Sequence, residues 1–188
     1  MASEIVDAVI EATVALLAEG GLGALTTNKI AGRAGVAIGS LYRYFPNREA
    51  IIAEVDLRYR RAAAERFLAA LDEFRGDLAA AVRAAITAYA VGGPPLAVRH
   101  ALMSEVPPGW LASGVERVWG AMLPPTVELL VERAPWLTSE EAARRIFLAL
   151  HATQGVMTGM VLWPIREADS ASVLEDLAAM ITGMLTSR

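Results

Sequence analysis

Cysteine is absent from the 188-residue chain, and histidine occurs only twice, at His100 and His151. The absence of thiols excludes disulfide bonds and thiolate metal sites, and it fits a protein of the cytoplasm. Two histidines so far apart, without cysteine, are a weak metal signal, and we expect neither a metal nor another cofactor. Phosphate-binding loops, nucleophile motifs and acid–base carboxylate pairs are missing too, so the sequence favours a binding protein over an enzyme.

Charged residues are absent from one long run, residues 146–165. A run of this length is long enough to cross a bilayer. It contains polar residues such as His151 and Gln154, however, and it follows an amphipathic helix start with a cap of its own. We therefore expect a buried helix and not a membrane span. The N-terminus carries Glu4 and Asp7 and does not have the positive region of a signal peptide.

Hydrophobic residues follow a helical periodicity along most of the chain. Hydrophobic residues make up 55% of it, and they recur at helical spacing between clusters of glycine and proline. No convincing strand appears, so we expect an all-α fold. Pro124 and Pro125 interrupt one apolar run, where we expect a bend or two separate helices. The expected helices cover about residues 3–19, 27–34, 38–44, 48–74, 77–91, 96–105, 110–134, 139–163 and 170–186.

Positive charge is concentrated in residues 25–48 of a chain whose formal net charge is −4. The charged side chains of this stretch are all cationic: Lys29, Arg33, Arg43 and Arg48. A local excess of one sign in a protein of the opposite sign indicates a polyanion as partner. Lys29 and Arg33 also fit solvated helix charges that supply only general attraction.

The same stretch has the pattern of two short helices joined by a tight turn. Thr26 is placed to cap the first helix, and Gly35 lies where the turn requires a positive φ. Leu41 and Phe45, four residues apart, are expected to dock the second helix on the core. The outer face then has small residues, hydroxyls and an arginine, which suit a DNA recognition helix. These outward residues are Ile38, Gly39, Ser40, Tyr42, Arg43 and Tyr44.

The order of residues 26–48 carries a resemblance to a known family. The matching residues are Thr26-Thr27, Ile30-Ala31, Ala34-Gly35-Val36 and Gly39-Ser40-Leu41-Tyr42-x-Tyr44-Phe45-x-Asn47-Arg48. In this order they are similar to the DNA-binding signature of the tetracycline-repressor (TetR) family of bacterial regulators. The resemblance implies a helix-turn-helix DNA-binding domain in residues 1–47. It further implies that a long fourth helix joins this domain to a helical effector-binding and dimerisation domain in residues 48–188.

The resemblance also implies roles for single residues. The family's phosphate-binding positions are occupied here by Thr27, Ser40, Tyr42, Tyr44 and Arg48, and Thr26 is grouped with them. The positions usual for base contacts are occupied by Asn28, Ile38, Gly39 and Arg43. Arg43 suits guanine and Asn28 suits adenine, each worth about 1–3 kcal/mol of discrimination. Asn28 replaces a longer side chain that is commoner in the family, which leaves the operator sequence open, and Arg48 stands where lysine is commoner.

Aromatic, methionine and polar residues outside this stretch are candidates for an apolar ligand cavity between helices. Each of them also fits an ordinary core residue. The candidates are Phe67, Tyr89, His100, Met103, Trp110, Trp119, Met122, Phe147, His151, Gln154 and Met157. A cavity of this composition favours a small apolar or aromatic effector.

The family pattern implies that the last two helices, about residues 139–163 and 170–186, pair with those of a second copy. Gly155-x-x-x-Gly159 would provide a flat surface for close helix approach. Such a dimer predicts a palindromic double-stranded operator, read by two helices roughly 34–36 Å apart. The expected function is that of a repressor released by its effector. The rival classes are an enzyme with His100 or His151 as base and an interaction protein that no longer reads DNA.

Overall fold

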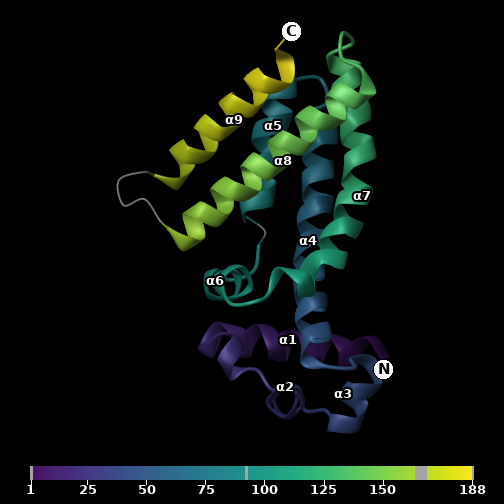
Figure 1. The fold of residues 1–188 in the computed structure, drawn as a ribbon, viewed down its shortest axis with the longest axis vertical. Helices are drawn as coiled ribbons and strands as arrows, with labels where there is room; N and C mark the ends of the chain where they lie inside the picture. The colour runs from purple at the N-terminus through teal and green to yellow at the C-terminus, as the bar shows by residue number, and fades with distance from the viewer. Residues whose placement is uncertain (1, 92, 164–168, 188) are drawn as a thin grey trace. The chain divides into compact units, whose positions relative to one another are not determined.

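The computed structural model describes residues 2–91, 93–163 and 169–187. Over this part of the chain the fold is all-α, without a strand, as the helical periodicity predicts (Figure 1). The helices are α1 (Ala2–Gly20), α2 (Thr27–Ala34), α3 (Ile38–Tyr44), α4 (Arg48–Glu73), α5 (Leu78–Val91), α6 (Leu96–Ser104), α7 (Pro108–Arg133), α8 (Ser139–Leu162) and α9 (Ser170–Thr186), and a short 3₁₀ turn, η1, covers Leu22–Ala24. None of these described helices is long and apolar enough to cross a membrane. The last two residues of the uncharged run, 164 and 165, lie outside the described residues.

The chain divides into two compact units that interleave in sequence. The N-terminal unit comprises Met1–Arg60 and Pro94–Glu116, and the C-terminal unit comprises Arg61–Gly93 and Arg117–Arg188. Helices α4 and α7 each contribute one end to each unit. The N-terminal unit therefore contains α6 and the start of α7 as well as the first three helices. The boundary predicted between residues 47 and 48 separates a DNA-binding domain from an effector-binding domain, not two packing units. It stays a prediction.

Helix α1 is the centre of the N-terminal unit, where it packs against α2, α3 and α6. Val9 and Leu17 on α1, Ile30 on α2 and Leu41 on α3 are at most 1% exposed. Helix α6 adds Val98 to the same core. Full burial of an aliphatic side chain of this size stabilises by about 1.5–3 kcal/mol relative to exposure. The short helices α2 and α3 are therefore held by this shared core and not by their own length.

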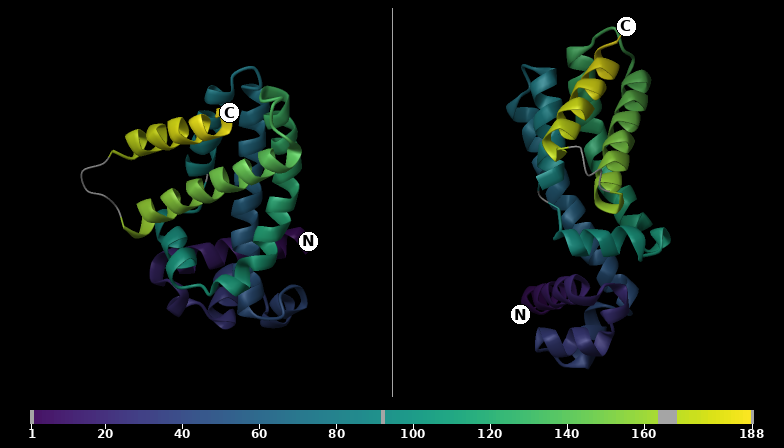
Figure 2. Two further views of the ribbon diagram at one scale, coloured as in Figure 1. Left: turned by 45° about the horizontal axis from the view of Figure 1, so that its top comes forward. Right: turned by 90° about the vertical axis from the view of Figure 1, so that its left-hand side faces the viewer.

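The C-terminal unit is organised around α9, which packs against α5 and α8. Both views in Figure 2 show α8 and α9 side by side. Its core combines Ile86 of α5, Leu130 of α7, Ile146 of α8, and Leu177 and Ile181 of α9, each at most 4% exposed. The helical periodicity of the sequence predicts this inner face of α9.

Helix α7 passes through both prolines that were expected to interrupt it. Pro124 and Pro125 lie within one helical element, so two separate helices do not form. Each proline lacks the N–H that would bond the carbonyl four residues earlier, at Gly120 and Ala121. All four residues are exposed, so water can bond these two carbonyls. The missing hydrogen bonds therefore cost little on this side of the helix.

Helix α8 begins with the capping box that its Thr-x-x-Glu pattern predicts. The Thr138 hydroxyl accepts the Glu141 N–H at 3.2 Å, and the Glu141 carboxylate accepts the Thr138 N–H at 2.9 Å. The carboxylate also accepts the Thr138 hydroxyl at 2.9 Å. These hydrogen bonds, led by the one from the backbone, hold the pKa of Glu141 below its ordinary value.

Replacing Glu141 by glutamine is expected to make folding less sensitive to acid. A carboxyl whose pKa is lower in the folded state contributes stability above its unfolded pKa. This contribution is lost as the pH falls through the folded pKa, and a glutamine amide has no such titration. Thermal unfolding over the acidic pH range should therefore show a smaller loss of stability for Glu141→Gln than for the wild type. Glu140→Gln, at an exposed neighbouring carboxylate, is the matched control, and equal pH profiles for wild type and Glu141→Gln would contradict the assignment.

Candidate nucleic-acid interface and internal cavity

One glycine fixes the turn between α2 and α3. Gly35 adopts a φ of 67° and a ψ of 26°, and its N–H bonds the carbonyls of Ala31 and Gly32. This is the left-handed region, where any residue with a Cβ is strained. Val36 follows, with its N–H 3.1 Å from the Ala31 oxygen and its side chain packed on the core. The positive φ predicted for Gly35 is confirmed, and the turn holds α3 in a set direction from α2.

Helix α3 has one buried and one exposed side. Leu41 is 0% exposed and Phe45, at its C-cap, 7% exposed, as their spacing predicts. On the other side, Tyr42 is 50% and Ile38 39% exposed, and Arg43 is exposed as well. Because Leu41 and Phe45 anchor the helix from behind, these outward side chains are available to a partner.

Hydrogen bonds of hydroxyl groups order this outer face. The Thr27 Oγ1 on α2 and the Tyr42 hydroxyl on α3 lie 3.0 Å apart. Arg43 Nη2 donates to the Tyr44 hydroxyl at 3.2 Å, and its guanidinium carbon lies 5.1 Å from the Tyr44 ring centroid. Contacts that restrict side chains before binding lower the entropy lost on binding. The two helices therefore present a partly preorganised polar surface.

The start of α2 is capped as predicted. Thr26 Oγ1 accepts the Lys29 N–H at 3.2 Å. Asn28 and Lys29 follow on exposed positions of the first turn, and neither side chain has a partner among the described residues. Arg33, by contrast, donates to both carboxylate oxygens of Glu19, at 3.0 and 2.7 Å, and this contact lowers the pKa of Glu19. The cation of Arg33 is thus locally neutralised, while that of Lys29 is available to an anion.

Arg48 is engaged by other protein groups. Its Nη1 donates to the Leu25 carbonyl at 3.1 Å, and its Nη2 lies 3.7 Å from a Glu49 carboxylate oxygen. The guanidinium also lies over the Trp110 ring, 5.9 Å from its centroid. The side chain is 34% exposed. Arg48 therefore differs from the exposed cations Lys29 and Arg43 in being tied to the backbone and to an aromatic ring.

The C-terminal unit contains a partly open cavity of about 50 Å³. Its hydroxyl groups belong to Thr126 and Thr153, which donate within their own helices to the carbonyls of Met122 and Ala149, each at 2.8 Å. No buried polar side-chain atom lacks a hydrogen bond in the described part of the chain. Both hydroxyl hydrogens are therefore already used, and the otherwise apolar wall suits a hydrocarbon. It is lined by Phe67, Leu71, Leu78, Val82, Ile86, Thr126, Leu129, Leu130, Ile146, Ala149, Leu150, Thr153, Ile181 and Leu185.

Comparison with known proteins connects this surface to DNA. Residues 9–55 match the family model described as "Bacterial regulatory proteins, tetR family". The match includes α2, the Gly35 turn, α3 and the beginning of α4. Residues 9–55 thus form a DNA-binding domain of the TetR type. The exposed face of α2 and α3 therefore lies within the DNA-binding domain of a bacterial transcriptional regulator.

Solved structures show the same fold along nearly the whole chain. The fatty acid degradation regulator FadR of Bacillus halodurans is 21% identical, with a TM-score of 0.70 over 98% of this chain and 97% of its own. A transcriptional regulator from Rhodococcus sp. Rha1 is 22% identical, with a TM-score of 0.67 over 96% and 95% of the two chains. FadR of Bacillus subtilis, solved in complex with stearoyl-CoA, is 21% identical, with a TM-score of 0.61 over 96% and 97%. No curated protein matches the sequence.

The residues predicted to bind an effector are dispersed in the fold. Phe67 lines the cavity described above. Tyr89, Met122 and Met157 pack in the core of the C-terminal unit, and Gln154 lies half-buried on α8. The aliphatic residues that form most of the cavity wall are not among the predicted effector residues. Their helical spacing marks them as core, and no feature of the sequence separates a cavity wall from a filled core.

Three of the predicted residues form an aromatic cluster on α7 and α8. The ring centroids of Phe147 and His151 are 3.9 Å apart, and those of Trp119 and His151 are 4.7 Å apart. Phe147 is 51% exposed, and His151 Nδ1 lies 2.9 Å from the Phe147 carbonyl oxygen. The cluster is therefore a feature of the helix surface and not of the cavity.

The remaining predicted residues, His100, Met103 and Trp110, lie in the N-terminal unit. His100 Nδ1 is 3.2 Å from the Ser104 hydroxyl, and Trp110 lies beneath Arg48. The two histidines thus belong to different units. Within the described ranges, no group of histidine and acidic side chains has the arrangement of a metal site.

Proposed function

We propose that the protein is a TetR-family repressor that binds a palindromic operator as a homodimer in the cytoplasm. A small, largely apolar effector releases it. The DNA-binding part of this proposal rests on one observation. The outer face of α2 and α3 is exposed and preorganised, and the buried Leu41 anchors it. In this proposal residues 1–47 read DNA, and residues 48–188 bind the effector and form the dimer.

Base contacts are proposed for the exposed residues at the centre of this face. Arg43 is placed to bind guanine and Asn28 to bind adenine, while Ile38 and Gly39 approach the base edges. Arg43 would exchange its contact with Tyr44 for the base. Phosphate contacts are proposed for the surrounding hydroxyl groups, because hydroxyls and backbone amides position a protein on the duplex without reading its sequence. These hydroxyls belong to Thr26, Thr27, Ser40, Tyr42 and Tyr44.

The effector is proposed to insert a hydrocarbon chain into the cavity of the C-terminal unit. The apolar wall and the paired hydroxyls of Thr126 and Thr153 support an occupant without internal polar groups. The stearoyl-CoA complex of the Bacillus subtilis relative supports an acyl chain as the first class to test. Pockets for small molecules measure about 300–1,000 Å³, so a cavity of about 50 Å³ must open to admit such a chain. The effector would therefore bind a state with a wider cavity better than this one, and such a difference in affinity is what any response requires.

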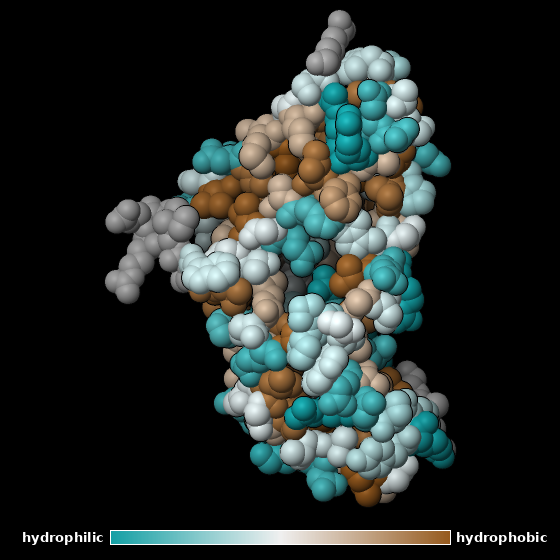
Figure 3. All heavy atoms as spheres, in the orientation of Figure 1, coloured by the Kyte–Doolittle hydropathy of each residue, from teal (hydrophilic) through white to brown (hydrophobic). Residues whose placement is uncertain are grey.

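Dimerisation is proposed through α8 and α9. Large apolar side chains lie exposed on both helices, with Phe147 and Leu148 at 51% and 50% on α8 and Met180 at 57% on α9. A Cβ added at Gly155 or Gly159 would meet no atom within 4 Å, which leaves α8 open to close approach by another helix. Hydrophobic residues gather over the part of the surface where α8 and α9 lie (Figure 3).

Replacing Leu148 by aspartate is expected to produce a monomer. A charge in an apolar helix interface stays unpaired when the interface closes, so dimerisation becomes unfavourable. Because both half-sites must be bound together, operator affinity should fall by about a hundredfold or more. Sedimentation measures the first effect and a gel shift the second. Leu96→Asp, at a 66% exposed leucine of the N-terminal unit, is the control and should remain dimeric.

Selection of duplexes from a random-sequence library by the purified protein tests the proposed function. Enrichment of a palindrome, with loss of its binding in Arg43→Ala, supports sequence-specific repression. Stearoyl-CoA and free stearate are then added to the complex, and release of DNA supports an apolar effector. Failure to enrich any sequence would favour an interaction protein that has kept the fold. Retention of the complex with both compounds would contradict an acyl effector.

A further inference from the structure

The connection between α1 and α2, residues 21–26, begins with a turn that lacks a local cap. Gly21 occupies the N-cap position of η1, with a φ of 62°, and it has no side chain to accept the first N–H. The first N–H groups of a helical turn have no partner within the turn itself. Here the Leu22 N–H donates to Glu105 Oε2 at 2.7 Å, across 83 residues of sequence. Glu105 therefore supplies the cap that Gly21 cannot supply.

Gly21 also makes room for this carboxylate. A Cβ on Gly21 would lie 2.8 Å from each of the two Glu105 carboxylate oxygens, closer than van der Waals contact allows. The glycine is thus suited to this place both by its positive φ and by its lack of a side chain. The local backbone and the distant carboxylate fit each other.

The other end of the connection is held by Arg48. Its Nη1 bonds the carbonyl of Leu25, which is 0% exposed, and the next residue, Thr26, caps α2. The Trp110 ring lies 5.9 Å below the guanidinium carbon. An indole face attracts a cation and covers one side of it from water. Trp110 therefore helps to hold the arginine in the position from which it bonds Leu25.

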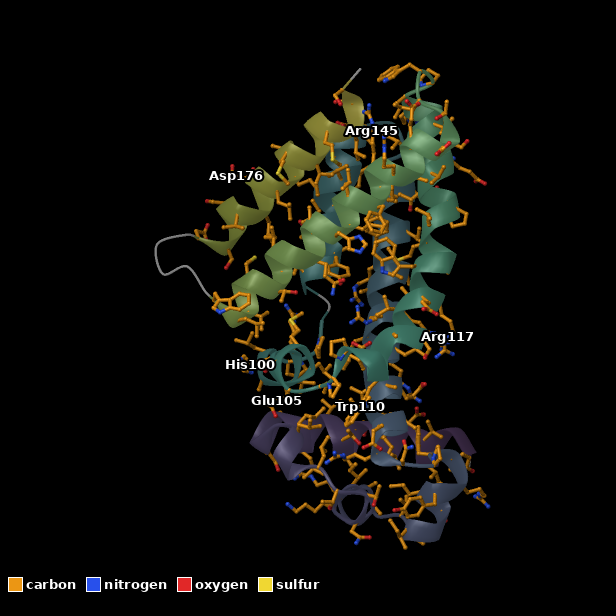
Figure 4. The ribbon with its side chains drawn as sticks, in the orientation of Figure 1. His100, Glu105, Trp110, Arg117, Arg145 and Asp176 are labelled. Carbon is orange, nitrogen blue, oxygen red and sulfur yellow. The ribbon has the colours of Figure 1, made fainter. Side chains whose placement is uncertain are left out.

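Glu105 and Trp110 lie close together in the fold as well as in sequence. Glu105 directly follows α6, and Trp110 lies in the first turn of α7. Figure 4 shows both on the side of these segments that is near α1. Both lie outside residues 9–55, the part of the chain that the family model matches. One short segment, 105–110, thus reaches both ends of the α1–α2 connection, directly at Leu22 and through Arg48 at Leu25.

We propose that Glu105 and Trp110 are positioning residues for DNA binding. By fixing both ends of the connection they set the place of the first turn of α2, from which Thr27 and Asn28 face the duplex. Arg48 then serves to hold the protein backbone and makes no phosphate contact. The inference rests on the proposed DNA-binding function, since it concerns how the reading surface is held.

Glu105→Ala and Glu105→Gln test the first contact on a palindromic duplex selected by the wild type. Specific affinity should fall about tenfold in Glu105→Ala, because the first turn of α2 is less well placed. Glu105→Gln keeps an acceptor oxygen at nearly the same place, so its loss should be smaller. Glu116→Gln is the charge-matched control, since Glu116 is exposed in the same unit and has no side-chain partner among the described residues. In the absence of DNA, the Leu22 amide should exchange its hydrogen faster than in the wild type in both Glu105 variants, and at the wild-type rate in Glu116→Gln.

The salt dependence of binding decides the role of Arg48. Loss of one phosphate contact lowers the slope of log affinity against log salt by about 0.9. Arg48→Ala and Trp110→Leu should each weaken specific binding without changing this slope. The double variant should lose less binding free energy than the sum of the two single losses, because both substitutions weaken the same Arg48 contact with Leu25. A slope lowered by about one contact in Arg48→Ala alone would identify a phosphate ligand and overturn the positioning role.

The remaining outcomes separate this inference from the proposed function. Wild-type affinity in Glu105→Ala, or unchanged exchange of the Leu22 amide, would overturn the role of Glu105 while DNA binding by the wild type stands. A wild type that enriches no duplex would contradict the proposed function, and the positioning role in DNA binding would fall with it. The thermal midpoint of each variant shows whether it is folded. If Glu105→Ala is unfolded, the results for Glu105→Gln decide the role of Glu105.

Discussion

Leu41→Ala is expected to lower the free energy of unfolding of the N-terminal unit by about 2–5 kcal/mol. Leu41 is 0% exposed and docks the exposed helix α3 on the core formed by α1 and α2. Truncation removes this burial and leaves a cavity that short helices of seven or eight residues are poorly able to close. Operator binding should be lost at temperatures where the C-terminal unit remains folded. Denaturant unfolding, followed separately by amide signals of the two units, measures the difference.

Ile38→Ala on the same helix is the matched control. Ile38 is 39% exposed, so its truncation should change stability by less than about 0.5 kcal/mol. Specific DNA binding should nevertheless weaken, because Ile38 lies on the proposed reading face. Equal destabilisation by the two substitutions would contradict the orientation of α3. Full operator binding by Ile38→Ala would instead remove Ile38 from the contact surface.

Ala149→Leu is expected to abolish the response to an apolar effector while operator binding persists. Ala149 is 8% exposed and lines the cavity of about 50 Å³ in the C-terminal unit. The added side chain occupies that space at a packing cost of about 1–3 kcal/mol. A typical effector changes operator affinity by about 5–150-fold, and this change should disappear in the variant. Titration of stearoyl-CoA into the complex with operator DNA measures it.

Ala121→Leu controls for the added volume. Ala121 is exposed on α7, away from the residues that line the cavity. This variant should retain both operator binding and release by the effector. An Ala149→Leu protein that still releases DNA at wild-type effector concentrations would place the effector site outside this cavity.

The geometry of α2, α3 and the turn between them could be predicted from sequence, because the residues that determine it lie close together in the chain. Thr26 caps α2 within three residues, and Gly35 needs a positive φ whatever surrounds it. Leu41 and Phe45 are four residues apart, so one face of a helix buries both. Patterns of this kind are complete within a short segment, and the structure confirms each of them.

Contacts between distant segments could not be predicted in the same way. Glu105 reaches Leu22 across 83 residues, and nothing in either segment marks the pair. Arg48 follows Asn47 at the start of α4, where the family resemblance implies a phosphate contact. Its place over Trp110, which lies shortly after α6, depends on how α6 packs against α1. Only the fold brings these groups together.

The residues that line the cavity could not be predicted from residue type. Residue type predicts Phe67, Trp119 and Phe147 as cavity residues. Phe67 does line the cavity, whereas the other two belong to an aromatic cluster on the surface. Residue type does not say which face of a helix is turned inward. In α8 the hydrophobic residues Ile146 and Phe147 are neighbours in sequence, and one is 2% exposed and the other 51% exposed. The direction of a side chain was therefore the missing information.

Footprinting of the protein on the duplex that it selects tests directly whether α2 and α3 read DNA as a dimer. We expect two protected half-sites related by two-fold symmetry, with centres roughly 34–36 Å apart. Arg43→Ala should remove the protection, and Leu148→Asp should reduce it to weak binding of single half-sites. Protection without a preferred sequence, or a sequence-specific footprint that survives Arg43→Ala and Ile38→Ala unchanged, would show that α2 and α3 do not read the DNA sequence.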